Sequence, residues 1–251
     1  MSARPDDPRP SDLTRVGLLG GMSWQSTAVY YRRLNELVQA RVGGHASAPL
    51  ILWSVDFAEI EALQRADDWP AQGRLLNDAA RRLEQAGAQA VALATNTLHL
   101  VADQITAGLG VPFVDLIDVA GDAVAAGGFD TVGLLATGYT MGSDLYPSRL
   151  AARGVRTLVP EGADRELVHG IIYAELVKGI VTDASRQAYL GVIDRLIARG
   201  AQAVILGCTE IELLLSDGDA PVPLLDTTEL HCQVLIDVIV NGVPATTGAT
   251  S

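Results

Sequence analysis

The stretch that decides the fold is RLEQAGAQAVALATNTLHL, residues 82–100, which occurs again as RLIARGAQAVILGCTEIEL, residues 195–213. Nine of these nineteen positions are identical, at a constant offset of 113 residues. A second segment, RVGLLGGMS at residues 15–23, is echoed less closely by TVGLLATGYT at residues 131–140. Each copy reads as an apolar strand that runs into a small polar loop and then a helix. The repeat predicts two related, pseudo-symmetric half-chains.

Strands and helices are expected to alternate along the chain. We expect strands at residues 16–20, 49–55, 89–94, 111–114, 132–135, 203–207 and 222–225. We expect helices at residues 25–41, 57–65 and 70–85, from 97, between 114 and 132, near 140–153, 164–179 and 185–199, and from 227. Strands separated by helices form parallel sheets. The expected fold class is therefore α/β, with two pseudo-symmetric domains of mostly parallel sheets flanked by helices and an active site in the cleft between them.

The length of the chain, 251 residues, is sufficient for two domains of ordinary size. We place the first domain at residues 14–117 plus 209–242 and the second at residues 118–208, with loose tails at 1–13 and 243–251. The chain begins MSARPDDPRPSD, which lacks the apolar core of a signal peptide. The longest apolar runs fall far short of the roughly 20 residues that a membrane helix needs, so no membrane association is expected.

Charge and cysteine content argue against several classes of function. The net charge of −12 argues against binding to nucleic acid, which requires clustered Lys and Arg. Two cysteines, Cys208 and Cys232, are too few for a disulfide framework and indicate a reducing cytoplasm. The sequence contains neither a C-x-x-C nor an H-E-x-x-H pattern, so no metal site is expected. It also contains no nucleotide-binding fingerprint and no motif that suggests pyridoxal phosphate, and we expect no cofactor.

Four polar loops each join a strand end to a helix start. They contain Gly20-Gly21-Met22-Ser23, Thr95-Asn96-Thr97, Thr137-Gly138-Tyr139-Thr140 and Cys208-Thr209-Glu210. In parallel sheets, ligands bind beyond the carboxyl ends of the strands. Backbone N–H groups and hydroxyls at helix starts bind small carboxylates. Ordinary turn and capping chemistry is the alternative for any one loop, but four loops in matching places favour a binding site.

The repeat places Thr95 opposite Cys208, one short reactive side chain in each half. That arrangement suits a nearly symmetric reaction, such as inversion of a stereocentre. A free thiol has a pKa of about 8.5, which a helix N-terminus lowers, and Cys208 is expected at a helix start where a thiolate is favoured. A threonine hydroxyl is too weak an acid to serve as a standing base. We therefore predict an asymmetric pair in which Cys208 removes a proton and Thr95 returns one, while Cys232 fills the core of the last helix.

Several segments resemble the aspartate/glutamate racemase family: GGMSWQSTAVYYRRLNELV, SVDFAEIEALQ, ATNTLH, TMGSDLYPSRL, HGIIYAELVKGIV, ILGCTEIELLL and LLDTTELH. They run in order from residue 16 to residue 238. The resemblance implies a cofactor-independent enzyme that binds a small amino diacid between two domains and moves its Cα proton with two residues on opposite faces. The matching pair is Thr95 and Cys208, as in the branch with Thr in the first half. The resemblance also implies that Cys208 faces the L-enantiomer, so L-substrates are expected to react better.

The candidate substrate-binding residues lie in the four loops and at one helix end. They are Gly21, Met22, Asn96, Thr97, Thr137, Thr140, Lys178, Thr209 and Glu210. Asn96 is expected to hydrogen-bond the substrate carboxylate, and Lys178, the single lysine of the chain, to pair with it. Glu210 is the candidate to assist proton transfer at Cys208, although an acid in the first turn of a helix also complements the helix dipole.

The histidines are assigned from their neighbours in the sequence. His99 lies one helical turn past Thr95 and is a candidate helper that orients the site, with a core position as the alternative. His231 is a weaker candidate, as is Asp226 in the same DTTELH segment. His45 and His169 are assigned to the surface or to turns.

Departures from the family pattern concern the second carboxylate of a diacid. Ala94 stands where close relatives often have Cys, Asp115 stands where they have His, and Gly138 stands where an Arg is frequent. SVDFAEIEALQ offers no cation before Arg65. The expected substrate is therefore aspartate, glutamate or a less acidic relative.

Two other functions stay open: a decarboxylase or cis–trans isomerase of small dicarboxylates, and a two-lobed binding protein without catalysis. The expected partner is a small amino-acid substrate, and a homodimer or a higher homo-oligomer is compatible with the resemblance.

Overall fold

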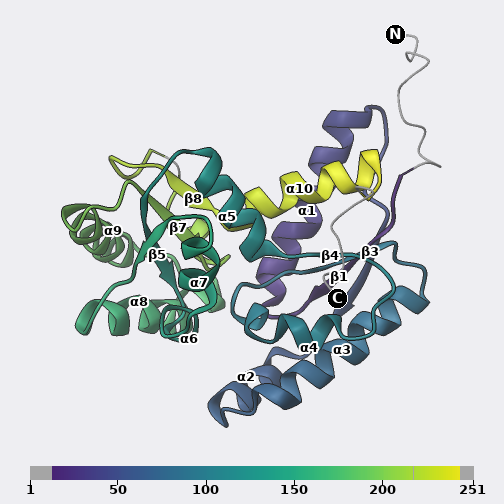
Figure 1. Ribbon diagram of the computed structural model, residues 1–251, viewed down its shortest axis with the longest axis horizontal. Coiled ribbons are helices and arrows are strands. Elements are labelled where there is room, and N and C mark those ends of the chain that lie inside the picture. The colour runs from purple at the N-terminus through teal and green to yellow at the C-terminus, as the bar shows by residue number, and fades with distance from the viewer. Residues whose placement is uncertain (1–12, 217, 244–251) are drawn as a thin grey trace. The chain divides into compact units, whose positions relative to one another are not determined.

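The structure is a computed structural model that describes residues 13–216 and 218–243 (Figure 1). Contacts divide these residues into two compact units. Within the described chain, unit 1 holds residues 13–94, 101–114 and 232–243, and unit 2 holds residues 95–100, 115–216 and 218–231. Except for residues 13 and 243, the predicted tails lie outside the described residues.

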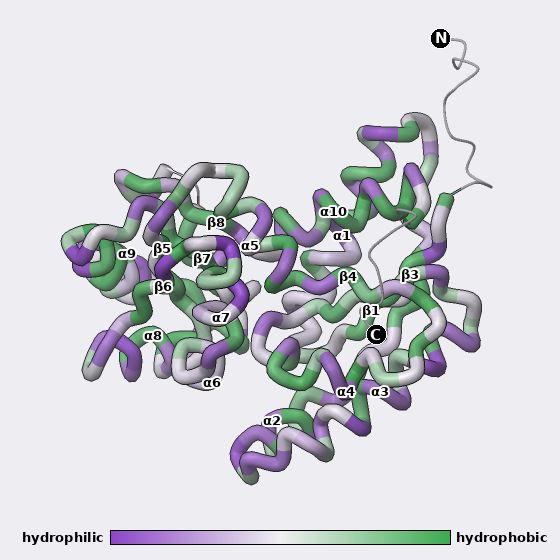
Figure 2. The backbone as a smooth tube through the Cα atoms, in the orientation of Figure 1, coloured by the Kyte–Doolittle hydropathy of each residue, from purple (hydrophilic) through white to green (hydrophobic). Residues whose placement is uncertain are grey.

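Unit 1 is built on a parallel sheet of four strands, β1 (Val16–Gly20), β2 (Leu50–Ser54), β3 (Ala90–Leu93) and β4 (Phe113–Val114). Its strand order is β2-β1-β3-β4. The helices of this unit are α1 (Trp24–Val42), α2 (Phe57–Arg65), α3 (Trp69–Gln85) and α4 (Ala102–Thr106). Along α3, hydrophobic and hydrophilic positions alternate, because one face of the helix packs into the core (Figure 2).

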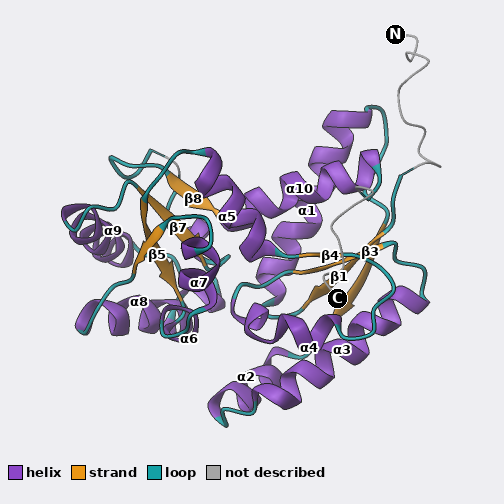
Figure 3. Cartoon of the chain, viewed as in Figure 1, coloured by secondary structure: helices purple, strands orange, loops and turns teal. Residues whose placement is uncertain are grey.

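Unit 2 repeats the same arrangement with strands β5 (Thr131–Ala136), β6 (Arg156–Leu158), β7 (Ala203–Gly207) and β8 (Leu224–Asp226) (Figure 3). The order is β6-β5-β7-β8, and every pair is parallel. Its helices are α5 (Leu116–Ala126), α6 (Gly138–Met141), α7 (Leu145–Ala151), α8 (Ala163–Ala174) and α9 (Asp183–Ala198), with short 3₁₀ turns η3 (Leu176–Lys178) and η4 (Ile211–Leu213). A further 3₁₀ turn, η2 (Thr97–Val101), precedes α4, and α10 (Thr227–Asn241) starts in unit 2 and ends in unit 1.

In each unit, a glutamine of the repeat links the start of one central strand to the start of the other, β3 to β1 in unit 1 and β7 to β5 in unit 2. The side chain of Gln89 accepts the backbone N–H of Arg15 at 2.9 Å. At the same place in unit 2, the side chain of Gln202 accepts the N–H groups of Asp130 and Thr131 at 2.7 and 3.1 Å. Each glutamine therefore satisfies backbone donors where a central strand begins. This shared task explains why the AQAV segment is the same in both halves.

The repeated leucine packs against a glycine of the central strand. A Cβ atom on Gly17 would lie 3.0 Å from the Cβ of Leu83, and one on Gly133 would lie 3.1 Å from the Cδ1 of Leu196. Both leucines are buried. The helix before each third strand therefore approaches the sheet at a point where only glycine leaves room. The two parallel sheets and their identical strand order confirm the expected fold class.

Several predicted elements differ from the structure. Strand β6 was not predicted, and the helix expected near residues 140–153 is two shorter helices, α6 and α7. The helix expected after Cys208 is only the three-residue turn η4. The boundary at residue 209 also differs, because residues 209–216 and 218–231 group with unit 2 together with residues 95–100. Within the described segments, no helix is long and apolar enough to cross a bilayer.

Replacing Gly21 with alanine is expected to lower the free energy of unfolding by at least about 3 kcal/mol. Gly21 has a φ of +93°, and an added Cβ atom would lie 2.2 Å from the carbonyl oxygen of Val55. Gly44, with a φ of +61° and no atom within 4 Å of the added Cβ, is the matched control. Its replacement by alanine should cost only about 1 kcal/mol. Urea unfolding measures both, and equal costs would contradict the close approach at Gly21.

Candidate active site

Cys208 lies directly after β7, at the carboxyl edge of the unit 2 sheet, with 7% of its surface exposed. Its thiol donates to Oε2 of Glu210 at 3.0 Å. The hydroxyl of Thr209 donates to the same oxygen, also at 3.0 Å. Glu210 is itself 5% exposed. The structure therefore places a thiol, a hydroxyl and a carboxylate in one buried contact, with the carboxylate as acceptor.

Burial raises the pKa of the Cys208 thiol well above its ordinary value, and the negative charge of Glu210 raises the pKa further. Both effects oppose the expected thiolate, and the helix N-terminus on which that expectation rested is also absent. The following helical element, η4, is a single 3₁₀ turn, whose dipole is small. The raised pKa favours the protonated thiol, and Glu210 is the carboxylate in contact with it.

Thr95 begins a six-residue segment that belongs to unit 2, although β3 before it belongs to unit 1. Its side chain is 8% exposed. Its carbonyl oxygen accepts a hydrogen bond from Nδ1 of His99 at 2.8 Å. Thr95 and Cys208, the two residues that the repeat placed opposite one another, thus lie in the same structural unit and are both nearly buried.

Asn96 follows Thr95 and is 3% exposed. Oδ1 of its carboxamide accepts the hydroxyl of Tyr146 at 2.6 Å, and Nδ2 donates to Oγ1 of Thr227 at 3.1 Å. Tyr146 and Thr227 are fully buried. Neither residue was predicted to belong to the site. They lie in the segments TMGSDLYPSRL and LLDTTELH, in which nothing along the sequence indicates a contact with Asn96.

Three threonine hydroxyls form a closed cluster. Oγ1 of Thr97 lies 3.0 Å from that of Thr137 and 3.1 Å from that of Thr140, and the latter two are 3.2 Å apart. The cluster joins the segment after β3 to the loop after β5. Thr97 and Thr137 are 5% and 6% exposed, whereas Thr140 is fully buried. Thr140 therefore supports the other two hydroxyls from the interior, and its role as a substrate ligand stays a prediction.

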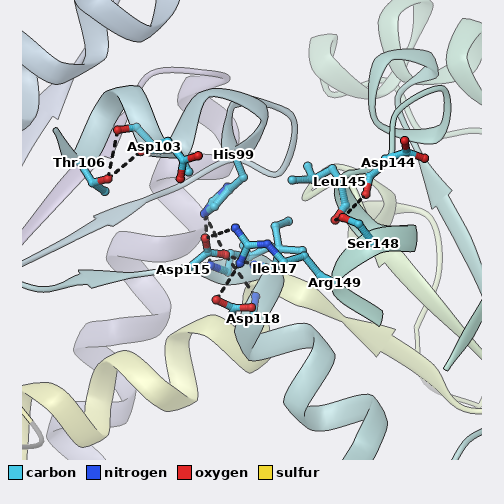
Figure 4. Close-up of polar contacts among 12 residues, drawn as sticks. His99, Asp103, Thr106, Asp115, Ile117, Asp118, Asp144, Leu145, Ser148 and Arg149 are labelled. Carbon is cyan, nitrogen blue, oxygen red and sulfur yellow. Dashed lines mark hydrogen bonds and ion pairs between the residues drawn. The ribbon is translucent and has the colours of Figure 1, made fainter. Parts of the chain in front are cut away.

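His99 is buried and holds one tautomer. Its Nε2 accepts the backbone N–H of Leu116 at 3.2 Å, so Nδ1 carries the proton that is donated to the Thr95 carbonyl. Oδ1 of Asp115 lies 4.0 Å from Nε2, and Oδ2 of Asp115 is 3.3 Å from Arg149 (Figure 4). Burial lowers the pKa of His99, although the charge of Asp115 opposes this. His99 is thus a neutral support for Thr95, which fits both alternatives given for it.

Asp115, which stands where the family pattern has His, caps α5. Its Oδ1 accepts the N–H groups of Ile117 and Asp118 at 2.8 and 3.1 Å. Burial acts to raise the pKa of Asp115, but its neighbours His99 and Arg149 and the two N–H bonds hold it below its ordinary value. Arg149 also contacts Asp118 at 2.7 Å (Figure 4). This substitution therefore serves the start of α5 rather than the substrate.

Replacing His99 with leucine should lower stability at pH 8 by about 2 kcal/mol or more, because the Thr95 carbonyl and the Leu116 N–H lose buried partners. The variant should also be less sensitive to acid. His99 has a lower pKa folded than unfolded, so wild-type stability is complete above about pH 6.5 and falls as acid protonates the unfolded state. Urea unfolding at pH 8 and pH 5.5 measures both effects. An unchanged pH slope in the variant would contradict a buried neutral His99.

The remaining candidates lie as follows. The N–H of Gly21 already donates to Oγ1 of Thr27 at 2.8 Å, so it is not available to a substrate. Met22 is 5% exposed, in unit 1. Lys178 ends η3 in unit 2 and is exposed. Cys232 is fully buried in α10, as predicted.

His169 and Asp226 each make a specific contact within unit 2. His169, assigned to the surface or to a turn, is half-buried on the helix α8, and its Nδ1 accepts the N–H of Gly138 at 3.0 Å. Asp226 ends β8 and contacts the carboxyl of Glu212; burial, and then Asp226, raise the pKa of Glu212 to about 10. His45 is exposed, as predicted, and His231 is buried. Among the described residues, no group of three or more His, Cys, Asp and Glu side chains is arranged to hold a metal ion.

Comparison with known proteins identifies a matching family and a curated relative. Residues 19–235 match the family described as Asp/Glu/Hydantoin racemase. A Bacillus subtilis protein, described as a broad specificity amino-acid racemase, is 21% identical over 226 residues, which cover 85% of this chain and 92% of the relative.

Solved structures share the fold. A Yersinia pestis protein, described as a candidate Asp/Glu racemase, is 46% identical with a TM-score of 0.84 and covers 90% of this chain and 99% of its own. An aspartate racemase homologue from Pyrococcus horikoshii is 32% identical with a TM-score of 0.79, over 90% of this chain and 99% of its own. Since the family match spans most of its length, the chain belongs to the Asp/Glu/hydantoin racemase family.

Proposed function

We propose that this racemase works without a cofactor and inverts the Cα of aspartate, glutamate or a related small amino acid by proton transfer between Cys208 and Thr95. The observation that carries the proposal is the contact of the Cys208 thiol with the Glu210 carboxylate, at 3.0 Å in a buried site. A thiol whose pKa is raised by burial is inert without a base, and a base is in contact with it.

The chemistry at Cys208 follows from this contact. The Glu210 carboxylate takes the thiol proton, and the sulfur then takes the Cα proton of the substrate, which restores the thiol. The electron pair left on Cα spreads into the neighbouring carboxylate. Because that carboxylate gains charge in the transition state, hydrogen-bond donors placed on it lower the barrier. Asn96 is the proposed donor, and Thr209, whose hydroxyl proton is held by Glu210, is proposed to line the site.

Thr95 is proposed to return a proton to the opposite face of Cα. It then regains a proton from solvent water, and Glu210 releases the proton that it took from the thiol to solvent, so both groups return to their starting states. Because a hydroxyl can donate to a carbanion but does not persist as an alkoxide base, the two faces are unequal. His99 fixes the backbone of Thr95 through its carbonyl. We therefore infer that substrates whose Cα proton faces Cys208, the L-enantiomers, react faster than their mirror images.

The other candidates complete the proposed substrate site. Lys178 is proposed to pair with a substrate carboxylate, and Thr97, Thr137 and Met22 to line the site. The loops of unit 2 carry hydroxyls, an amide and the acidic Glu210, so amino acids without a second carboxylate belong in the substrate panel. The broad specificity of the Bacillus subtilis relative supports the same choice. Both cysteines are buried and neither is in a disulfide, which supports the proposed cytoplasmic location.

Chiral chromatography tests the proposed activity. Purified protein is incubated with each enantiomer of aspartate, glutamate and a set of neutral and basic amino acids, and the opposite enantiomer is measured. Appearance of the opposite enantiomer, faster from L than from D, is the expected result. Release of CO2 without inversion would replace racemase by decarboxylase. Ligand binding with no reaction of any amino acid would replace it by a binding protein.

A further inference from the structure

The carboxamide of Asn96 is held from both sides by a chain of three hydrogen bonds within unit 2. The hydroxyl of Tyr146 lies 2.6 Å from Oδ1, and Nδ2 lies 3.1 Å from Oγ1 of Thr227. Thr227 in turn donates to the carbonyl oxygen of Leu206 at 2.8 Å. All four residues are at most 3% exposed. The chain therefore runs through the interior of unit 2, from α7 to β7.

The carbonyl oxygen of Leu206, at the end of this series of hydrogen bonds, determines the direction in which every proton in the series is donated. The Leu206 carbonyl has no proton to give, so the single hydroxyl proton of Thr227 points to it. Oγ1 of Thr227 must therefore accept from Asn96, and the atom that faces it must be the nitrogen, Nδ2. The carboxamide oxygen then faces Tyr146, which must donate. The amide orientation follows from chemistry rather than from an arbitrary choice between oxygen and nitrogen.

Two consequences follow from the fixed orientation. Asn96 keeps one uncommitted hydrogen on Nδ2, whereas a flipped carboxamide would present an oxygen that repels an anion. The chain also joins the segment that begins with Thr95 to a backbone carbonyl two residues before Cys208. Burial raises the pKa of Tyr146 well above its ordinary value, so its hydroxyl keeps the proton that the chain requires.

We propose that Tyr146 and Thr227 are positioning residues that lock the Asn96 carboxamide so that its free N–H donates to a substrate carboxylate oxygen. These two hydrogen bonds, called the lock below, orient a group that binds the ligand and do not contact the proton-transfer groups. The inference rests on the proposed function only for the identity of that ligand. Removing the hydroxyl of Tyr146 leaves Oδ1 of Asn96 buried without a donor, which favours rotation of the carboxamide. Removing the hydroxyl of Thr227 releases the other end.

The first test follows the carboxamide itself and needs no activity. The chain has only four asparagines, Asn35, Asn77, Asn96 and Asn241, so selective 15N-amide labelling gives four pairs of side-chain signals. Asn96→Ala identifies one pair by its loss. In Tyr146→Phe and Thr227→Val, hydrogen exchange of the Asn96 pair is expected to accelerate about tenfold or more, since each removes a hydrogen bond. Thr227→Ser keeps the hydroxyl and should keep the wild-type exchange rate.

The second test separates positioning from general stability. Tyr146→Phe and Thr227→Val should each lower kcat/KM by about 10- to 100-fold, and Thr227→Ser should restore most of it. In an Asn96→Ala background, neither substitution should lower kcat/KM further, because the group through which it acts is gone. If Tyr146→Phe costs the same factor in both backgrounds, Tyr146 does not act through Asn96 and the proposal is overturned.

The two tests also distinguish this inference from the proposed function. Unchanged exchange of the Asn96 amide in both Tyr146→Phe and Thr227→Val overturns the lock, whatever the activity of the wild type. Accelerated exchange together with a wild type that inverts no amino acid supports the lock and overturns the racemase proposal instead.

Discussion

Replacing Cys208 with alanine will lower kcat/KM for amino-acid inversion by at least about a thousand-fold, because the group proposed to take the Cα proton is removed. Asn96, the proposed ligand of the substrate carboxylate, remains in place, since its hydrogen bonds do not involve the thiol. Substrate affinity should therefore change little. Initial rates by chiral chromatography and substrate binding by calorimetry measure the two quantities separately.

Cys232→Ala is the matched control for this experiment. Cys232 is also buried and in no disulfide, but it lies in α10 and packs in the core. Its replacement should lower stability by about 1 kcal/mol and leave kcat/KM within a few-fold of wild type. If Cys208→Ala keeps more than a few per cent of wild-type activity, or if Cys232→Ala loses as much as Cys208→Ala, the assignment of Cys208 is wrong.

Replacing Glu210 with glutamine will change activity and thiol reactivity in opposite directions. The rate of inversion should fall about 100- to 1,000-fold, because the base that takes the thiol proton is lost. The pKa of Cys208 should fall at the same time, because a negative charge that raises it has been removed. More of the sulfur is then thiolate at neutral pH. Alkylation by iodoacetamide should therefore become faster and should reach half its maximum rate at a lower pH.

The alkylation is measured in a Cys232→Ala background, where Cys208 is the only thiol of the chain. Glu166→Gln, an exposed acid on α8 of the same unit, is the control and should change neither quantity. A fall in both activity and alkylation rate in Glu210→Gln would contradict the role of Glu210 as the acceptor of the thiol proton.

The sequence was most informative where elements are fully buried or repeated. Strands β1 and β7 have the predicted bounds, because every residue in them is buried and apolar runs of that length are typical of central parallel strands. Strand β6 was missed, since it has three residues of which only Leu158 is buried. Its pairing with β5 depends on the tertiary structure and leaves no pattern along the chain.

The part of the candidate site that lies within the sequence repeat could be predicted. The repeat selected Thr95, Cys208 and the loops around them, and the structure brings the loops of residues 95–100, 137–140 and 208–210 into one unit. Tyr146 could not be found in this way, because its contact with Asn96 joins positions 50 residues apart. The surroundings of Cys208 could not be predicted either, since its burial and its contact with Glu210 depend on the tertiary structure, and both raise the pKa of the thiol.

The most direct test of the account is proton NMR in D2O with the wild-type protein and, separately, L-Asp, D-Asp, L-Glu and D-Glu, extended to any other amino acid found to be inverted. The account predicts that the Cα proton signal of the L-enantiomer disappears as deuterium enters, faster than that of the D-enantiomer, and that inverted product accumulates. Retention of the Cα proton signal in every amino acid tested would contradict proton transfer at Cα, and with it the proposed function.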